Sequence, residues 1–368
     1  MSELPLCDNY ADILTGPAAL LDVRAPVEFA KGAFPNTCNI PLLDDKARHL
    51  VGIEYKKAGQ QAAIDLGGRL LPDSVRESLT NRWLGFTSQH PEGYLYCFRG
   101  GLRSRIVQQW LHDAGRSYPI VKGGYKALRR YSIDALAQQC EELPLCLLGG
   151  RTGTGKTRLL NTIPRSIDLE GLARHRGSSF GRMVVDQPSN IDFENAIAIE
   201  MLKHARQGKS AVFLEDEARM IGSACIPLPL RERMQTAPVV ILETSLSRRV
   251  QIAIEDYVVD LLQRYEQHKG AIHGFEAYAS YHRGSLYRVR KRFGGQDYKI
   301  ASELLERALS EHYSNHDLTH YEPFIELILT RYYDPMYDYQ MRAKQERLVF
   351  AGNETAVKEW VASQCGQS

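Results

Sequence analysis

The chain has 368 residues, a formal net charge of +2, and 43% hydrophobic and 24% charged residues. Because this length exceeds what one hydrophobic core usually supports, we expect at least two domains. The composition is that of a folded chain, and no apolar run reaches the roughly 18 residues that a membrane-spanning helix needs. The first residues also lack the basic and apolar regions of a signal peptide. We therefore expect a cytoplasmic enzyme with no membrane partner.

Seven cysteines are spread along the chain without a CxxC pair, at positions 7, 38, 97, 140, 146, 225 and 365. This spacing argues against a structural metal and against a disulfide framework. One reactive thiol among inert ones is the simplest interpretation.

Short apolar runs at residues 19–24 and 93–97 predict buried parallel strands in the first part of the chain. Residues 104–115 carry apolar side chains at helical spacing and end on a glycine, and residues 118–124 predict a further strand and a turn. Strand, loop, helix and strand form a βαβ unit. The adjacent glycines at 67 and 68 fit a turn or a close approach of the backbone equally well.

Pro144 follows a predicted helix and marks the boundary of a first domain, residues 1–140. A second domain, residues 141–245, contains three more short apolar runs typical of buried strands. From there on the pattern is mostly helical, which defines a C-terminal region, residues 246–368. The sequence thus predicts an α/β protein with two α/β domains and a helical C-terminal region packed on the second.

The stretch "YCFRGGLRS", residues 96–104, places Cys97 between a predicted strand and a predicted helix. Its two glycines let the backbone turn with the N–H groups directed inward, and such a loop at a helix N-terminus stabilises an anion. Arg99 and Arg103 add positive charge. Because the thiolate is the reactive form of cysteine, we expect these three residues to form a catalytic site.

This loop and the stretch "LLDVRAPVEFAKGAFPNTCNIPL", residues 20–42, resemble the rhodanese family. In that family the loop cysteine accepts sulfur as a persulfide, so the resemblance implies that Cys97 carries a transferable sulfur or selenium atom. Two alternatives stay open. The spacing from Cys97 to Arg103 also matches the loop of cysteine phosphatases, although Tyr96 stands where those enzymes have histidine. A buried cysteine can also serve packing alone.

The stretch "GRTGTGKT", residues 150–157, is a complete phosphate-binding loop (P-loop) between a predicted strand and a predicted helix. Glycines let the loop amides converge on a phosphate, and the lysine neutralises its charge. The candidates for binding a diphosphate group are Gly150, Gly153, Gly155, Lys156, Thr157 and Asp216. The loop alone does not say what the diphosphate is attached to, and it can hold a diphosphate without splitting a nucleotide.

Acidic residues follow the next apolar run, in "AVFLEDEAR", residues 211–219. In P-loop enzymes a strand ending in an acidic residue contributes to a magnesium site. If Mg²⁺ binds here, Thr157, Glu215 and Asp216 are the candidate ligands.

Over essentially its whole length the chain resembles the bacterial tRNA 2-selenouridine synthases. The resemblance rests on the rhodanese-like start, the cysteine loop and the P-loop, together with "DLEGLARHRGSSFG" (168–181) and "LEDEARMIG" (214–222). It implies a transferase that modifies the wobble uridine in the anticodon loop of tRNA.

The implied reaction has two steps and two co-substrates. The sulfur of 2-thiouridine first displaces diphosphate from geranyl diphosphate, and selenium from selenophosphate then replaces the geranylated sulfur. In this scheme the P-loop stabilises the departing diphosphate, and Cys97 carries selenium as a perselenide. The selenophosphate synthetase is a candidate partner.

Two basic segments are candidates for contact with the tRNA backbone. Their members are Arg174, Arg176, Arg182, Arg283, Arg288, Arg290, Lys291 and Arg292. The helical C-terminal region is expected to contact tRNA as well. An alternative function is a nucleotide-dependent kinase or ATPase fused to a rhodanese sulfurtransferase.

Overall fold

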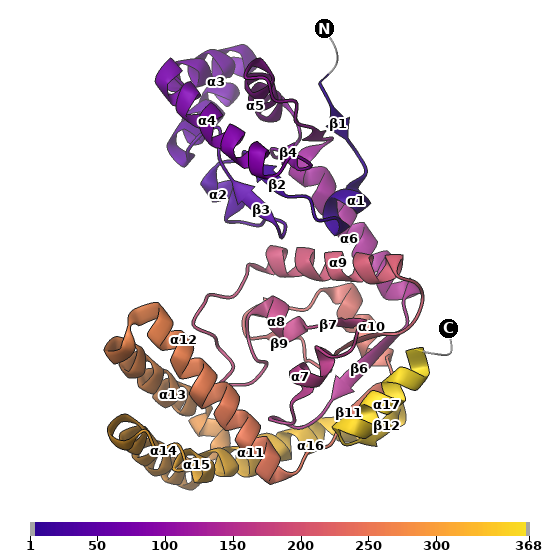
Figure 1. The fold of residues 1–368 in the computed structure, drawn as a ribbon, viewed down its shortest axis with the longest axis vertical. Coiled ribbons are helices and arrows are strands. Elements are labelled where there is room, and N and C mark those ends of the chain that lie inside the picture. Colours follow the sequence, from indigo (N-terminus) through magenta and orange to yellow (C-terminus); the bar gives the residue numbers. More distant parts are fainter. Residues whose placement is uncertain (1–3, 366–368) are drawn as a thin grey trace. The chain divides into compact units, whose positions relative to one another are not determined.

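A computed structural model describes residues 4–365 and divides the chain into two compact units, each built around a parallel β-sheet (Figure 1). The first unit comprises Met1–Gln138 and Ser189–Lys203, and the second comprises Gln139–Pro188 and His204–Ser368. The α/β class predicted from the sequence is confirmed. Within residues 4–365, no helix combines the length and the apolar character needed to cross a bilayer.

The first unit has a five-stranded sheet in the order β1-β5-β4-β2-β3, in which all paired strands run parallel. The strands are β1 (Leu6–Cys7), β2 (Leu20–Asp22), β3 (Thr37–Asn39), β4 (Tyr94–Tyr96) and β5 (Ile120–Val121). The helices are α1 (Tyr10–Thr15), α2 (Pro26–Phe29), α3 (Asp45–Leu70), α4 (Asp73–Gln89), α5 (Leu102–Asp113) and, running past the boundaries of the unit, α6 (Gly124–Glu142) and α9 (Asn190–Arg206). The central strand, β4, carries the cysteine loop at its carboxyl end.

The sequence pattern identifies β2, β4, α5 and β5 but misses the long helices α3 and α4. In α3 the only fully buried residue is Ala63, so its sequence has no apolar stripe that would reveal a helix. Gly67 and Gly68 lie inside α3, so a turn at this pair is wrong. The chain bends instead at Gly59, whose φ of 83° interrupts the helix.

The second unit also has a five-stranded parallel sheet, in the order β12-β11-β6-β8-β7, with a separate β-hairpin. Its strands are β6 (Leu145–Gly149), β7 (Ser166–Ile167), β8 (Val212–Glu215), β9 (Met220–Ile221), β10 (Ala224–Cys225), β11 (Val239–Leu242) and β12 (Leu348–Gly352). The helices near the sheet are α7 (Lys156–Leu160), α8 (Leu169–Ala173), α10 (Leu228–Thr236) and α17 (Glu354–Cys365). The central strand, β6, is buried along its length and leads into the P-loop.

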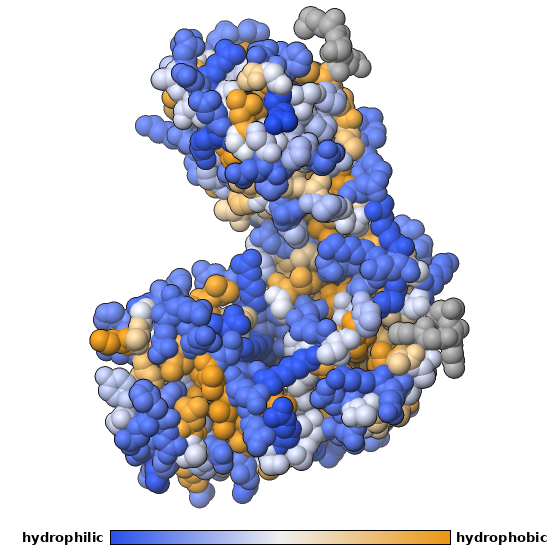
Figure 2. Space-filling view, viewed as in Figure 1, coloured by the Kyte–Doolittle hydropathy of each residue, from blue (hydrophilic) through white to orange (hydrophobic). Residues whose placement is uncertain are grey.

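The remaining helices of the second unit, apart from the short helix η3, share one hydrophobic core. They are α11 (Leu246–Ile254), the π-helical segment η1 (Glu255–Val259), α12 (Asp260–Lys269), α13 (Ala271–Phe293), α14 (Gly295–Asn315), α15 (Tyr321–Ile328), the π-helical segment η2 (Leu329–Tyr333), α16 (Asp334–Arg342) and the short 3₁₀ helix η3 (Gln345–Arg347). Figure 2 shows hydrophobic side chains at the surface where these helices lie. Strand β12 returns to the sheet beside β11, which the sequence pattern does not predict.

Candidate active site

Cys97 directly follows β4, and only 3% of its surface is exposed. The loop after it ends at Gly101, the residue that precedes α5. The thiol therefore lies just before a helix N-terminus, where the helix dipole favours a negative charge. This is the strand–loop–helix arrangement that the sequence predicts for the loop.

The cysteine loop is fixed to the beginning of α6 by backbone hydrogen bonds. The Cys97 carbonyl accepts from the Tyr125 N–H at 2.9 Å, and the Phe98 carbonyl accepts from the Lys126 N–H at 2.9 Å. A Cβ atom at Gly124 would lie 2.3 Å from the Cys97 oxygen, so this position has room only for glycine. The sequence indicated a turn there but not its contact with the cysteine loop.

Arg103 forms a two-pronged ion pair with Glu28, at 2.5 Å and 3.2 Å. Burial alone would raise the pKa of Glu28, but the hydrogen bonds and charge of Arg103 outweigh it and lower that pKa. The Arg103 guanidinium is also close enough to Cys97 to interact with it electrostatically. Arg99, in contrast, is exposed. Glu28 thus orients one of the two predicted arginines, and sequence reasoning did not assign it this role.

A buried ion pair lies behind the loop. Arg24 and Asp22 are 1% and 0% exposed, and their charged groups approach to 2.6 Å. The Arg24 guanidinium also lies 3.9 Å from the centre of the Tyr125 ring. Since the Tyr125 N–H binds the Cys97 carbonyl, this pair supports the wall against which the cysteine loop packs.

The P-loop follows β6 and ends at the beginning of α7. Gly150, Gly153 and Gly155 all have positive φ values, which side-chain-bearing residues rarely adopt. The Lys156 ammonium group donates a hydrogen bond to the Gly150 carbonyl at 2.8 Å and thus lies against the loop itself. The Thr157 hydroxyl donates to the Glu170 carboxylate at 3.1 Å.

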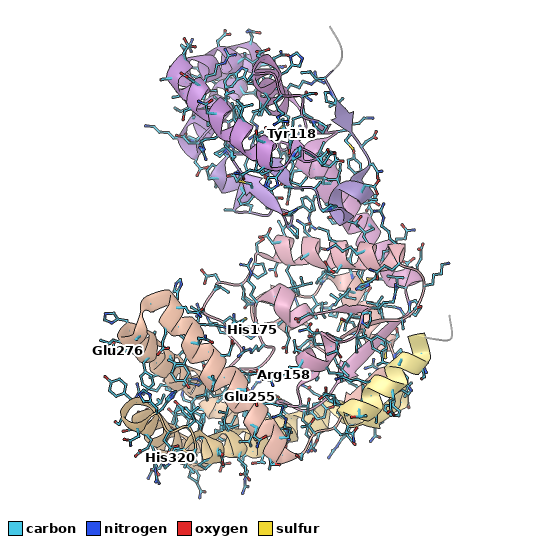
Figure 3. The ribbon with its side chains drawn as sticks, viewed as in Figure 1. Tyr118, Arg158, His175, Glu255, Glu276 and His320 are labelled. Atoms are coloured by element: carbon cyan, nitrogen blue, oxygen red, sulfur yellow. The ribbon has the colours of Figure 1, made fainter. Side chains whose placement is uncertain are left out.

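Arg249, which is 3% exposed, holds the P-loop from the side of α11. Its Nε donates to the Thr152 carbonyl at 2.9 Å, and its other nitrogens bind Asp334 at 2.6 Å and 3.0 Å. Arg158 of α7 pairs with Glu255 of η1, and Figure 3 shows these two side chains next to each other. The helical region therefore positions the P-loop from two directions.

A cavity of about 520 Å³ lies over the P-loop and brings all six predicted diphosphate residues together. It is lined by Gly150, Gly153, Gly155, Lys156, Thr157 and Asp216. Arg176, proposed from the sequence for tRNA, also lines it, as do Glu170, Glu217 and Lys344. Lys344 binds Asp216 at 2.6 Å, so Asp216 already has a cationic partner.

Two acidic residues near this cavity, Glu215 and Glu217, have raised pKa values. Glu215 is fully buried and accepts the Leu169 N–H at 2.8 Å, and burial, with the charges of Asp168 and Glu170, raises its pKa well above its usual range. Burial, with the charge of Glu170 added, raises the pKa of Glu217 to about 8. Among residues 4–365, no group of three or more His, Cys, Asp and Glu side chains is arranged to hold a metal ion.

We expect the pKa of Glu217 to make diphosphate binding depend on pH. Below pH 8 Glu217 is protonated and neutral, whereas above pH 8 it adds a negative charge beside an anionic ligand. In metal-free buffer, raising the pH from 7 to 9 should weaken inorganic diphosphate binding about three- to tenfold more in the unmodified protein than in Glu217→Gln. Isothermal titration calorimetry of both proteins tests this, because the titration of diphosphate itself is common to both. Parallel pH profiles would contradict it.

The two basic segments predicted to contact tRNA meet in the structure, although more than a hundred residues separate them in sequence. Arg288 of α13 donates to the Ser179 carbonyl at 3.4 Å. Burial, together with the charges of Arg182 and Arg288, lowers the pKa of His175, and Figure 3 shows His175 in the part of the unit near Arg158.

Three of the predicted basic residues are engaged elsewhere. Arg283 is paired with Glu306 at 2.6 Å, Arg176 is paired with Asp260, and the Arg290 guanidinium lies 3.5 Å from the centre of the Tyr287 ring. The other exposed candidates are Arg174, Arg182, Arg288, Lys291 and Arg292.

These features define a two-unit α/β protein of the P-loop class that also carries a cysteine loop at the central strand of a second parallel sheet. A family model described as "tRNA 2-selenouridine synthase AAA domain" matches residues 143–368. The chain belongs to the tRNA 2-selenouridine synthase family.

Curated relatives agree along nearly the full length of the chain. A tRNA 2-selenouridine synthase of Marinobacter nauticus is 47% identical over 363 residues, which cover 99% of each chain. One of Cupriavidus necator is 46% identical over 98% of each chain. One of Hahella chejuensis is 47% identical over 96% of this chain and 94% of the relative.

Proposed function

We propose that this protein converts 2-thiouridine at the wobble position of tRNA into 2-selenouridine in two steps. The observation that carries the proposal is that a chain of this family places a cysteine loop and a P-loop at the carboxyl ends of the central strands of two parallel sheets. Parallel α/β sheets bind ligands at this edge. Each step of the proposed reaction uses one of these loops.

In the first step the sulfur of 2-thiouridine attacks C1 of geranyl diphosphate, and diphosphate leaves. The P-loop amides and Lys156 would stabilise the charge that develops on the departing diphosphate. Arg176 lines the same cavity, but its charge is already paired with Asp260. Alkylation turns the sulfur into a better leaving group for the second step.

In the second step selenium from selenophosphate replaces the geranylated sulfur, and we assign the Cys97 thiolate to this exchange as a nucleophile: it would attack C2 of the geranylated uridine and displace geranylthiolate, and the selenide released as water converts selenophosphate to phosphate would then displace Cys97. A perselenide on Cys97 would instead need an oxidant, because the selenium of selenophosphate is at the oxidation level of selenide. Over both steps, geranyl diphosphate, selenophosphate and water are consumed, and diphosphate, geranylthiol and phosphate are released. This balance needs no external oxidant or reductant. The position of Cys97 before α5, with Arg103 held by Glu28 nearby, supports an anionic nucleophile there.

Mg²⁺ is proposed to bind only together with the diphosphate. The donors that fit it best are the Thr157 hydroxyl and the Glu170 carboxylate, since they lie 3.1 Å apart and are oxygen ligands of the kind that Mg²⁺ prefers. Glu215 and Asp216 fit less well, because Glu215 binds a backbone N–H and Asp216 binds Lys344. When bound, the ion would neutralise charge on the diphosphate.

The tRNA would be held by its phosphates near the place where residues 174–182 meet α13, with Arg182 and Arg288 as the central contacts. The selenophosphate synthetase remains a proposed partner for delivery of selenophosphate.

The proposal is tested by incubating the purified protein with tRNA that carries 2-thiouridine and then analysing nucleosides by mass spectrometry. We expect S-geranyl-2-thiouridine with geranyl diphosphate alone, and 2-selenouridine once selenophosphate is added. Rapid phosphate release from ATP, without a geranylated nucleoside, would instead support the alternative of a nucleotide-dependent kinase or ATPase.

A further inference from the structure

A second, smaller cavity in the second unit, of about 50 Å³, has a lining that exposes only apolar atoms. Phe180, Ala253, Val258 and Leu329 line it together with one face of α15. The Phe324 and Ile328 side chains of that face are 4% and 5% exposed. The cavity therefore suits a hydrocarbon group and offers no partner for a polar one.

This apolar cavity adjoins the cavity over the P-loop. Four residues line both spaces: Thr152, Ser178, Tyr257 and Tyr333. The residues of α15, in contrast, line only the apolar cavity. A ligand with its diphosphate on the P-loop can thus extend a tail past Tyr257 and Tyr333 toward α15.

The two π-helical segments found in residues 4–365 both border the apolar cavity. The Asp260 N–H donates to the Glu255 carbonyl, and the Asp334 N–H donates to the Leu329 carbonyl, each five residues back. Single π turns inside α-helices occur frequently at functional sites, because the extra residue changes the direction of neighbouring side chains. Here the two segments supply Tyr257 and Tyr333, the residues at the junction of the two cavities.

Among the described residues that line the apolar cavity, His282 is the one histidine, and it stays uncharged. The Nε2 atom of His282 lies 3.1 Å from the Tyr257 carbonyl, and burial lowers the pKa of His282 to about 4. The cavity is therefore neutral at physiological pH. A nucleotide base placed in it would lose its hydrogen bonds to water without replacement, which is unfavourable.

We propose that this cavity receives the distal end of the hydrocarbon tail of the diphosphate substrate and that α15 sets the length of tail accepted. This inference rests on the proposed function. Because the cavity is smaller than a geranyl tail, the first part of the tail would lie beside Tyr257 and Tyr333, which line both spaces. Aromatic rings at this position would stabilise the positive charge that develops on C1 of the tail as diphosphate leaves.

The test compares prenyl transfer to tRNA from dimethylallyl, geranyl and farnesyl diphosphate. Phe324→Ala enlarges the cavity and should raise the farnesyl-to-geranyl ratio of kcat/KM about tenfold. Ala253→Leu fills the cavity and should lower geranyl transfer about tenfold while dimethylallyl transfer is retained. Phe293→Ala is the matched control, since Phe293 lies in the same hydrophobic core but does not line the cavity.

Binding of inorganic diphosphate serves as the readout for folding and for the P-loop, and all three variants should retain it. If Phe324→Ala no longer binds inorganic diphosphate, the tail-length preferences of Ile328→Val and Ala253→Leu test the assignment of the cavity instead. Absence of geranyl transfer by the unmodified protein overturns the proposed function. The assignment of the cavity is overturned if the unmodified protein transfers geranyl but every variant has the same tail-length preference as Phe293→Ala.

Discussion

Replacing Lys156 with alanine is expected to lower the rate of geranyl transfer to tRNA by about two to three orders of magnitude. The ammonium group lies 2.8 Å from the Gly150 carbonyl, at the beginning of α7, where the diphosphate is proposed to lie. Its removal takes away the positive charge closest to the leaving group. The measurement is the initial rate of S-geranyl-2-thiouridine formation, with nucleosides quantified by mass spectrometry.

Lys209→Ala is the matched control for this prediction, because Lys209 is an exposed lysine of the same unit that does not line the P-loop cavity. The control should geranylate tRNA at the unmodified rate. Equal rates for Lys156→Ala and Lys209→Ala would contradict the role of the P-loop in geranyl transfer.

The second large effect is expected from Cys97→Ala, which should lower selenium incorporation by more than about a thousandfold while geranylation continues. The substitution removes one buried sulfur atom and leaves the backbone contacts of the loop with Tyr125 and Lys126 in place. In the presence of both co-substrates, S-geranyl-2-thiouridine should therefore accumulate. Nucleoside analysis over time measures both products in one sample.

Cys38→Ala controls for loss of a thiol in general, because Cys38 is an exposed cysteine on β3 of the same sheet. It should make 2-selenouridine normally. Loss of geranylation in Cys97→Ala, or normal selenium incorporation by it, would show that Cys97 does not have the role assigned here.

Local sequence pattern predicts the interior strands of the two sheets because short apolar runs are a strong signal for buried parallel strands. Strands β2, β4, β6, β8 and β11 all lie within such runs. Strand β12 is not predicted because it is an edge strand with largely exposed residues. Its place beside β11 depends on a chain return across the whole helical region, and local pattern does not encode that contact.

In the candidate site, too, local motifs are predictable from the sequence and long-range contacts are not. The cysteine loop and the P-loop are contiguous motifs, so sequence alone identifies Cys97 and Lys156. Glu28, Gly124 and Glu170 are each distant in sequence from the group they serve, and only the fold brings them close. Glu170 lies in the first turn of α8, where acidic residues are common, and local pattern does not identify it as the partner of Thr157.

The apolar cavity cannot be predicted from the sequence for a further reason. Its walls come mostly from Phe180 and from the helical segments α11, η1, α13, α15 and η2, which carry ordinary core residues there, with Thr152 and Ser178 on the side of the P-loop. Aromatic and aliphatic side chains at helical spacing predict a packed core equally well. Only the three-dimensional arrangement shows that the space between them adjoins the P-loop.

The central claim, that the P-loop serves only the first step and the cysteine loop the second, is tested most directly with tRNA that already carries S-geranyl-2-thiouridine. Lys156→Ala protein, supplied with this tRNA and selenophosphate, should form 2-selenouridine at the unmodified rate, whereas Cys97→Ala protein should form none. Failure of Lys156→Ala on the geranylated tRNA, to the same extent as on tRNA with 2-thiouridine, would contradict the division of the reaction between the two loops.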